Sequence, residues 1–364
     1  MEKFSKIIVL TIIGLSAAGA LYVCCSHTLS HRSRTAEIDI PSKPSLPEVR
    51  RARLVFAGDL MQHTPQLTAA RTPEGDFDFN ASFDWVRERF RAADAAIVNL
   101  ETTLSESGPY TGYPCFRSPA ALAEALDSLG VDITVLANNH CCDGGAAGIR
   151  TTIRELDRCG IRHTGVFADS ADYRRNHPLR LTWCGVRIAL VNYTYGTNGL
   201  PVPAGTIVNL IDTLRMAADL ERARRGADFV VACMHWGNEY ERRENASQRA
   251  VAGFLRRHGV DLVVGSHPHV VQPWRADSSH VVLFSLGNLV SNQRRRYTDG
   301  GLVACIEALR HPDGRMTYRL DPVPVWVALP RYRILPPEAA DTMHLPADYA
   351  RFREDLRELT GGEL

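Results

Sequence analysis

Short apolar runs alternate along this chain with amphipathic stretches. Runs dense in Val, Ile, Leu and Ala predict buried strands, and apolar residues three or four positions apart predict helices. The predicted strands cover 51–56, 95–98, 133–136, 161–166, 229–234, 261–264 and 281–284. The predicted helices cover 82–91, 120–129, 145–158, 213–225, 246–258 and 347–359. This alternation is typical of an α/β fold built from packed layers.

Two further pairs of segments predict β-structure without an intervening helix. Residues 179–183 and 186–191 predict a hairpin around Cys184-Gly185, and the longer segments 302–309 and 316–327 predict strands that close a sheet. Every strand of the first group except 161–166 is followed closely by polar residues, so candidate site residues are expected at these strand ends.

The N-terminus has a different composition from the rest of the chain. Lys3 and Lys6 precede residues 7–25, a run of 19 uncharged, mainly apolar residues. A helix of that length can cross a hydrocarbon core of ~30 Å. The basic residues before the run favour a cytoplasmic N-terminus, with the rest of the protein outside the cytoplasm. A cleaved signal peptide and a lipoprotein anchor on Cys24 or Cys25 are the alternatives.

These features divide the chain into four predicted parts. Residues 1–25 are a membrane anchor or signal segment, and residues 26–50, with three prolines, are a linker. Residues 51–330 form the main domain, and residues 331–364 are a C-terminal extension that contains a helix. We therefore expect a single-pass protein of the cell membrane whose catalytic domain is extracytoplasmic.

Composition limits the classes of function. The chain has 364 residues, of which 45% are hydrophobic and 23% charged, enough for a large core. A formal net charge of +1 argues against nucleic acid as a partner, and we interpret Arg294-Arg295-Arg296, the one basic triplet, as a solvated loop. The nine cysteines include no CxxC pair and predict neither a zinc ribbon nor a disulfide framework.

Two histidines one residue apart follow the predicted strand 261–264. His267 and His269 would lie together at the carboxyl end of that strand. Neutral imidazole is the commonest metal ligand in proteins, so this pair indicates a metal site. Two unrelated surface histidines on one loop are the alternative.

Acidic, amide and imidazole side chains follow other predicted strands in the same way. Because strand ends meet at one edge of a layered α/β fold, these side chains should converge. Helix capping is the alternative for Asp59, and a polar turn is the alternative for Asn139. A mixed set of carboxylate, amide and imidazole groups suits one or two divalent ions, such as Mn, Fe or Zn. The predicted ligands are Asp59, Glu101, Asn139, His235, His267 and His269.

Such a site predicts hydrolysis. Two ions ~3.5–4 Å apart can activate water and hold a phosphoryl oxygen, and Glu101 is suited to bridge them. We expect His140 to act as the general acid, with Asp143 orienting it.

Three residues are predicted to contact the substrate: Arg117, Glu239 and Asn288. The planar guanidinium of Arg117 can hold an anionic group. A solvent-facing or helix-capping arginine is the alternative for this position.

Six motifs occur in an order that resembles the CapA family, bacterial proteins associated with poly-γ-glutamate capsule synthesis and export. The resemblance covers roughly residues 53–290, and that family is similar to the calcineurin-like metallophosphoesterases. It implies a four-layer α/β/β/α sandwich with mixed sheets. The motifs are Gly58-Asp59-Leu60-Met61, Asn99-Leu100-Glu101, Ala137-Asn138-Asn139-His140 with Asp143 and Gly145, His235-Trp236-Gly237-Asn238-Glu239-Tyr240, Gly265-Ser266-His267-Pro268-His269 and Ser285-Leu286-Gly287-Asn288.

The resemblance also implies roles for single residues. Asp59 corresponds to the first metal-binding aspartate, Glu101 to the bridging acidic residue, and Asn139-His140 to the asparagine ligand with its catalytic histidine. His235 corresponds to the lone histidine ligand, and His267 and His269 to the final ligand pair. The chain departs from the wider phosphoesterase pattern where a histidine is expected two residues after Asp59.

Met61 occupies that position. One metal site is therefore expected to be weak, singly occupied, or completed by His63.

The expected function is a membrane-anchored protein of capsule or envelope polymer assembly with a metal-dependent phosphoesterase-type site. Its expected partners are the membrane, an anionic polymer or phosphoester substrate, and capsule synthase subunits. A metal-dependent hydrolase of another envelope ester or amide is the second interpretation. A non-enzymatic scaffold of a polymer-export complex is the third.

Overall fold

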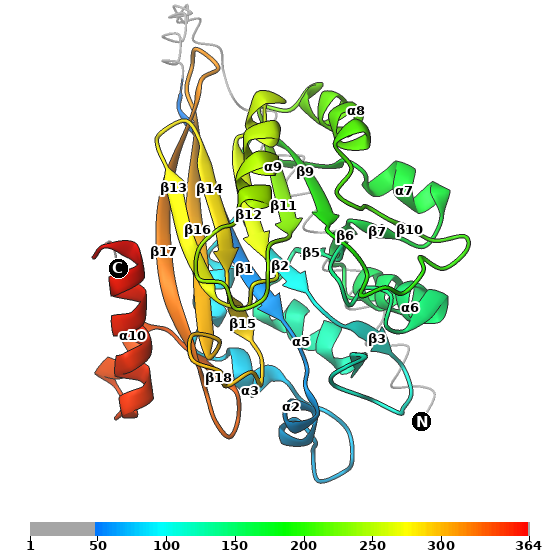
Figure 1. Cartoon of the computed structure of the whole chain (residues 1–364), viewed down its shortest axis with the longest axis vertical. Coiled ribbons are helices and arrows are strands. Elements are labelled where there is room, and N and C mark those ends of the chain that lie inside the picture. Colours follow the sequence, from blue (N-terminus) through cyan, green and yellow to red (C-terminus); the bar gives the residue numbers. More distant parts are fainter. Residues whose placement is uncertain (1–47, 363–364) are drawn as a thin grey trace, which may run out of the picture. The chain divides into compact units, whose positions relative to one another are not determined.

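Two mixed β-sheets stack face to face in the computed structural model, which describes residues 48–362 (Figure 1). The predicted anchor at 1–25 and residues 26–47 of the predicted linker lie outside the described residues. Among residues 48–362, no helix has both the length and the apolar character needed to span a membrane.

The larger sheet combines parallel and antiparallel strands. Its parallel half runs from β1 to β6, and its antiparallel half joins β1 to β18 through β16 and β17. In spatial order its strands are β18 (Arg333–Leu335), β17 (Met316–Ala328), β16 (Gly300–Arg310), β1 (Arg50–Leu60), β2 (Ala95–Leu100), β5 (Ile133–Val135) and β6 (Arg162–Thr164), with β15 (Asn288–Val290) paired to the end of β1.

The second sheet is also mixed, with four parallel strands between two antiparallel edges. Its spatial order is β13 (Val271–Ala276), β14 (Val281–Leu286), β12 (Leu262–Ser266), β11 (Phe229–His235), β9 (Val186–Thr194) and β8 (Leu179–Trp183). Two small ladders pair β3 (Thr103–Ser105) with β4 (Arg117–Pro119) and β7 (Val166–Phe167) with β10 (Ile207–Val208).

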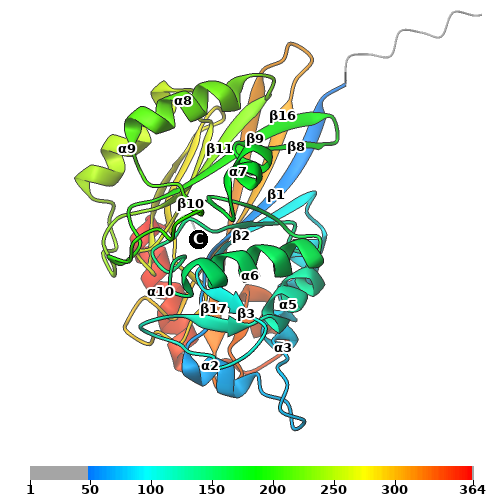
Figure 2. The same ribbon diagram turned by 90° about the vertical axis from the view of Figure 1, so that its right-hand side faces the viewer.

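Helices cover the outer face of each sheet, as Figure 2 shows for α8 and α9 on one side and α5 and α6 on the other. The helices are α2 (Thr64–Ala69), α3 (Asn80–Phe83), α4 (Arg87–Arg91), α5 (Ala121–Leu129), α6 (Gly145–Arg158), α7 (Ser170–Asn176), α8 (Thr213–Arg224), α9 (Ala246–Arg257), the 3₁₀ helix η1 (Pro337–Asp341) and α10 (Ala347–Thr360). The predicted four-layer α/β/β/α sandwich with mixed sheets is confirmed.

Alternation along the strands builds three apolar cores. In β1, Leu54 and Phe56 point into the core between the sheets, whereas Val55 points into the core beneath the helices. In β11, Val231 faces the inter-sheet core and Ala232 packs toward α8 and α9. Because both faces of these strands are buried, they read as continuous apolar runs in the sequence.

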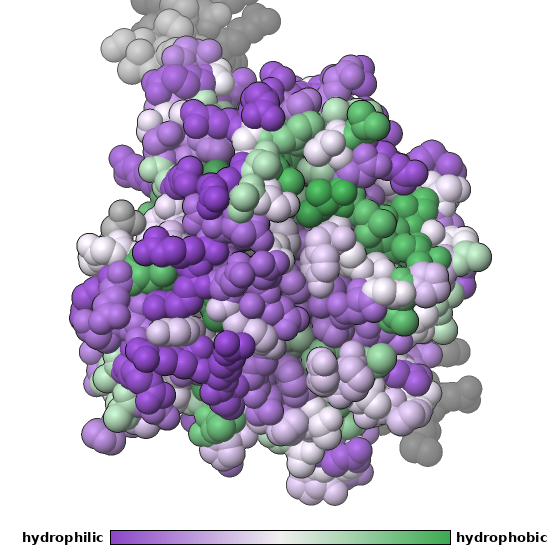
Figure 3. Space-filling view, in the orientation of Figure 1, coloured by the Kyte–Doolittle hydropathy of each residue, from purple (hydrophilic) through white to green (hydrophobic). Residues whose placement is uncertain are grey.

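Residues 331–362, the described part of the predicted C-terminal extension, contribute to the same sandwich. Strand β18 pairs with β17, and α10 buries Tyr349, Phe352 and Leu356 in the inter-sheet core. Figure 3 shows a largely hydrophilic face toward the viewer, with hydrophobic side chains gathered near α8 and β10, where Leu210 and Leu214 are exposed.

Some predicted elements were wrong in extent. The helix expected over 82–91 is two short helices, α3 and α4, because Val86 donates its N–H to Phe83 three residues back. This tighter turn still buries Phe83, Val86 and Phe90 together. Strand β1 was expected to end at Phe56 but continues to Leu60, because β15 and β2 pair with its end.

Strand β13 was not predicted because Pro273 interrupts its pattern. Gln272 and Trp274 pair with β14, whereas Pro273 between them has no partner in the ladder. A proline is tolerated here because β13 is an edge strand. The described cysteines are free thiols, as expected without a disulfide framework.

Candidate metal centre

The carboxyl ends of strands from both sheets meet at one place. Asp59 is the second-last residue of β1, beside Asn99 of β2 on one side and Asn288 of β15 on the other. His235 is the last residue of β11, and His267 directly follows β12, the next strand. The convergence expected from the strand-end motifs is therefore present, and the helix-cap alternative for Asp59 was wrong.

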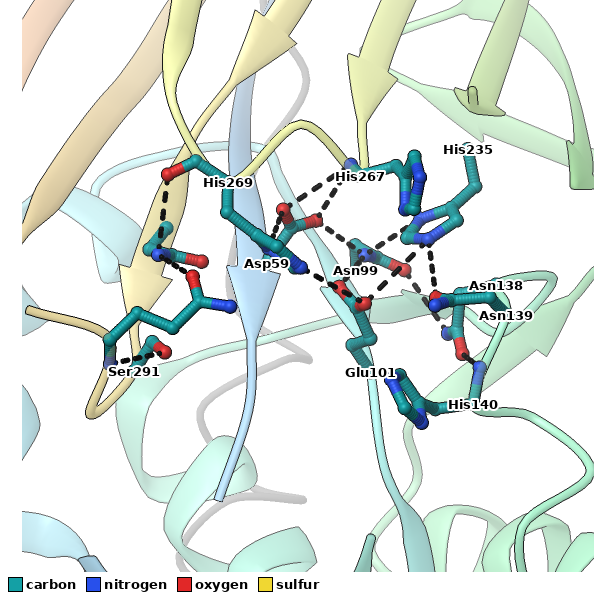
Figure 4. A network of polar contacts seen from close by, with 12 residues as sticks. Asp59, Asn99, Glu101, Asn138, Asn139, His140, His235, His267, His269 and Ser291 are labelled. Atoms are coloured by element: carbon teal, nitrogen blue, oxygen red, sulfur yellow. Dashed lines mark hydrogen bonds and ion pairs between the residues drawn. The ribbon is translucent and has the colours of Figure 1, made fainter. Parts of the chain in front are cut away.

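Five predicted ligands form two overlapping groups of buried side chains (Figure 4). In the first group, one ligand atom from each of Asp59, Glu101 and His235 lies within 4.8 Å of the others. In the second group, Glu101, His267 and His269 meet the same limit. Glu101 belongs to both groups, so it has the position that a bridging carboxylate needs.

Two buried atoms of the candidate ligands have no hydrogen-bond partner in the described part of the chain. Within the described residues, Glu101 Oε1 and His267 Nδ1 are buried and accept or donate no hydrogen bond. A buried polar atom left unpaired is costly, so its retention in the centre of a cluster needs an explanation. Carboxylate oxygen and imidazole nitrogen are ligands for Mn, Fe and Zn. These residues therefore fit a divalent cation.

Burial and neighbouring charge set the protonation of the cluster. Burial lowers the pKa of His267 to about 3 and that of His235 well below its ordinary value, so both imidazoles are neutral near pH 7. Burial works against ionisation of Asp59, but the hydrogen bond and charge of His269, the charge of His235 and the hydrogen bond from Asn99 together outweigh it and hold the pKa of Asp59 low. Burial, and then the charge of Asp59, raises the pKa of Glu101 well above its usual range.

A bound cation would relieve that conflict, because it supplies the positive charge that two adjacent buried carboxylates lack.

The loop carrying the two histidines is strained. His267 has φ 101° and His269 has φ 57°, a region that favours glycine. The backbone N–H of His267 lies 3.3 Å from both carboxylate oxygens of Asp59, and His269 Nδ1 lies 3.0 Å from one of them. Strain of this kind persists at functional sites where surrounding contacts enforce it.

Asn139 joins the cluster through His235, whose Nε2 lies 2.8 Å from Asn139 Oδ1. Asn99 was missed as a site residue although it lies at the centre. Its Nδ2 donates to Asp59 Oδ1 at 2.8 Å and to Glu101 Oε2 at 3.3 Å. Asn99 and Glu101 are two positions apart at the end of one strand, so they share a face, and that spacing could have identified Asn99.

The predicted acid and its orienting residue are in contact. His140 Nδ1 lies 2.8 Å from Asp143 Oδ2, and the same oxygen accepts the backbone N–H of Phe116 at 2.6 Å. The ring of Phe116 packs edge-on against His140, with centroids 4.6 Å apart. Asn198, from the loop after β9, places its Nδ2 3.5 Å from both His140 nitrogens.

A cavity of about 370 Å³ opens over these groups. Four of the predicted catalytic or metal-binding residues line it: Asn139, His140, Asp143 and His269. Glu239, predicted to contact the substrate, also lines it. The remaining walls are Met61, His63, Tyr113, Pro114, Cys115, Phe116, Asn198, Leu200, Tyr240 and Gln293.

Two predicted substrate residues do not line this cavity. Arg117 donates instead to Ser105 Oγ at 2.7 Å and to the carbonyl of Ser107. Asn288 is fully buried and donates to the carbonyl of Thr298 at 2.8 Å, a contact that holds the loop after β15.

His63 reaches the cavity but not the clusters of ligand atoms. It is the N-cap residue of α2, and Asn292 N lies 3.4 Å from its Nδ1. Within the described part of the chain, neither group of candidate ligands includes it. Met61 is buried in the cavity wall, at the position where the phosphoesterase pattern has a histidine.

Comparison with known proteins bears on this geometry. Residues 53–293 match the profile of a family described as bacterial capsule synthesis protein PGA_cap. The chain is 25% identical over 282 residues to the PGA biosynthesis protein CapA of Bacillus subtilis, covering 76% of this chain and 72% of that protein. It is 30% identical over 187 residues to the capsule biosynthesis protein CapA of Bacillus anthracis, covering 50% of this chain and 45% of that one.

A solved structure of a novel phosphatase from Mycoplasma pneumoniae superposes with a TM-score of 0.48 and 12% identity, over 78% of this chain and 97% of that one.

Proposed function

The chain belongs to the bacterial capsule synthesis protein family PGA_cap, and we propose that it is a divalent-metal hydrolase of the phosphoesterase type acting in capsule or envelope polymer assembly. One observation carries the proposal. Two carboxylates and three imidazoles are buried together, and Glu101 Oε1 and His267 Nδ1 have no hydrogen-bond partner among the described residues. A buried carboxylate is retained where a cation compensates its charge.

The buried carboxylates and imidazoles are the proposed metal ligands. Asp59, Glu101, His235, His267 and His269 would hold one or two ions of Mn, Fe or Zn, with Asn139 beside His235. A bound ion of this kind supplies Lewis acidity toward a phosphoryl or acyl oxygen. Asn99 holds Asp59 and Glu101 in place through its amide donors.

His140 has the geometry of a proton donor. Asp143 engages its Nδ1, which fixes the ring orientation and leaves Nε2 as the nitrogen that can give a proton to a leaving group. Phe116 and Asp143 exclude other orientations of the ring. Glu239 and Tyr240 also line the cavity, where they would help to orient the substrate.

We further propose that residues 1–25 anchor the protein in the cell membrane as a single-pass segment, with the domain outside the cytoplasm. The basic residues before the apolar run support this orientation. The proposed partners are capsule synthase subunits, and the proposed substrate is an anionic capsule polymer such as poly-γ-glutamate. Fractionation of cells and protease treatment of spheroplasts test this directly, because an external domain is degraded without lysis.

A scaffold role is the second candidate, and Met61 is the observation that favours it, since it removes one expected metal ligand. Hydrolysis of bis-(p-nitrophenyl) phosphate by the full-length protein, with Mn, Fe or Zn added and then chelated, separates the two. Metal-dependent turnover supports the hydrolase. Bound metal without turnover of phosphodiester, activated ester or activated amide supports the scaffold.

A further inference from the structure

A second hollow lies beside the metal cavity. It has a volume of about 360 Å³, and its walls are Arg294, Arg295, Arg296, Tyr297, Asp299, Arg351, Phe352 and Asp355. Gln293 lines the metal cavity and its neighbour Arg294 lines the second hollow, so the two adjoin at the loop after β15. Figure 3 shows strongly hydrophilic side chains over the region between β15 and α10.

The arginines of this hollow are only partly neutralised. Arg296 makes a two-point contact with the Asp355 carboxylate, at 2.7 and 3.2 Å, and Arg351 pairs with Asp348 at 2.9 Å. Arg294 donates to the carbonyl of Val327 at 3.0 Å. In the described part of the chain, Arg294 and Arg295 have no carboxylate within ion-pair distance. Since the whole chain carries a net charge of only +1, this is a local concentration of positive charge.

A reciprocal pair of stacked side chains fixes the wall between the two hollows. The guanidinium carbon of Arg295 lies 4.7 Å from the ring centroid of Tyr240, and that of Arg242 lies 3.9 Å from the ring of Tyr297. Each contact joins the loop after β11 to the loop after β15. Both tyrosines have positive φ, 68° and 78°, so the loops are held in conformations that need such support.

We propose that this hollow is a subsite for carboxylate groups of an extended acidic polymer whose reacting unit lies in the metal cavity. The Arg296–Asp355 contact shows the geometry in which a carboxylate binds here. Arg295 has no carboxylate partner among the described residues, so its guanidinium can bind a carboxylate of the polymer. It lies next to Tyr240 of the cavity wall. A polymer with one carboxylate per unit can place one unit in the cavity and the next units against these arginines.

The inference rests on the proposed function, because the metal cavity supplies the position of the reacting unit. The inference adds where the units of the polymer outside the metal cavity would bind, and which side chains would recognise their carboxylates. Arginine holds carboxylates through its planar fork, so replacement by lysine should not restore full affinity.

Binding of fluorescein-labelled oligo-γ-glutamates to the full-length protein in neutral detergent tests the inference by anisotropy. The variant R295Q/R351Q removes two guanidiniums that make no hydrogen bond to the backbone. We expect its affinity for long oligomers to fall by roughly tenfold or more, and binding to weaken with added salt. Short oligomers that fill only the cavity should bind both proteins equally.

The matched control is R256Q/R257Q, which removes two exposed arginines of α9. Equal weakening of oligomer binding by both double variants would overturn the subsite, because it would reduce the effect to net charge. Tighter binding of inorganic polyphosphate than of oligo-γ-glutamate at the wild-type hollow would also overturn it. Unfolding temperatures of the variants, compared with that of the wild-type protein, identify any loss of oligomer binding that is caused by misfolding. Oligomer binding by the R295K variant then shows whether the planar guanidinium is needed or a positive charge is enough.

The two proposals fail separately. A protein that holds no metal but loses oligomer binding in R295Q/R351Q contradicts the hydrolase and supports the subsite. A protein with metal-dependent turnover whose oligomer binding is unchanged in that variant supports the hydrolase and overturns the subsite.

Discussion

Gly58 and Gly287 lie backbone against backbone, and a Cβ at position 58 would come within 2.0 Å of the Gly287 carbonyl oxygen. The same oxygen accepts the backbone N–H of Asp59 at 3.0 Å. Two glycine-containing motifs far apart in the sequence therefore interlock, and their contact sets Asp59 beside Asn288 at the metal centre.

The first prediction concerns this contact. Gly58→Ala should destabilise the protein by about 1–3 kcal/mol, because the new methyl group meets a backbone carbonyl that cannot move aside easily. It should also lower metal content by displacing Asp59. Gly196→Ala is the control, since nothing lies within 4 Å of a Cβ there. Chemical unfolding and metal analysis of both variants check this, and equal behaviour would refute the interlock.

The second prediction separates catalysis from ligation. His140→Ala should keep the metal and reduce turnover of an activated phosphodiester by roughly 10²–10⁴-fold, the usual contribution of a general acid. Asp143→Asn should also slow turnover, because the carboxylate holds His140 Nδ1 at 2.8 Å. Steady-state kinetics and metal content are measured together. Loss of metal or of folding in His140→Ala would show that the residue is structural.

The third prediction is a pH effect away from the site. Burial opposes ionisation of Asp228, but the hydrogen bonds and charge of Arg187, together with the contact from Arg310, outweigh it and lower the pKa of Asp228 to about 2. A depressed carboxyl pKa stabilises the fold above the unfolded pKa of about 3.9 and loses that effect as pH falls toward 2. Asp228→Asn should cost about 1 kcal/mol at pH 7.

That cost should shrink between pH 5 and pH 3, measured by urea unfolding. Asp76→Asn, at an exposed position without an ion pair among the described residues, is the control. A cost for Asp228→Asn that stays constant over this range would count against the assigned ion pair.

The fourth prediction addresses the C-terminal segment. Phe352 of α10 is 3% exposed and packs in the inter-sheet core, so Phe352→Ala should destabilise the whole domain by about 3–5 kcal/mol. Leu214→Ala, at a residue 85% exposed, should change stability by less than about 0.5 kcal/mol. A single unfolding transition shifted only by the first variant is expected. An unshifted main transition would show that 331–364 folds independently.

The strands and their convergence could be predicted because local patterns encode them. Buried strands such as β11 read as unbroken apolar runs, and polar residues such as His235 mark their ends. In layered α/β folds the carboxyl ends of the strands meet at one edge, regardless of the length and sequence of the connecting loops. The positions of Asp59, Glu101 and His267 follow from those two rules.

Other features depend on pairings between distant segments, which local patterns do not contain. Arg117 turns toward Ser105 because β4 pairs with β3, and nothing in its own loop indicates that partner. The arginine triplet at 294–296 was interpreted as a solvated loop. The triplet does lie in an exposed loop, but its Arg296 also contacts Asp355 of α10, a residue 59 positions further along the chain, which the local pattern did not indicate.

The central claim is that the buried cluster holds a divalent metal, and metal content of the purified full-length protein tests it most directly. Elemental analysis by mass spectrometry should find one or two equivalents of Mn, Fe or Zn in the wild-type protein and clearly less in His267→Ala. His344→Ala, which replaces an exposed histidine, should retain the wild-type content. A folded wild-type protein without these metals, together with equal metal uptake by His267→Ala, would contradict the account.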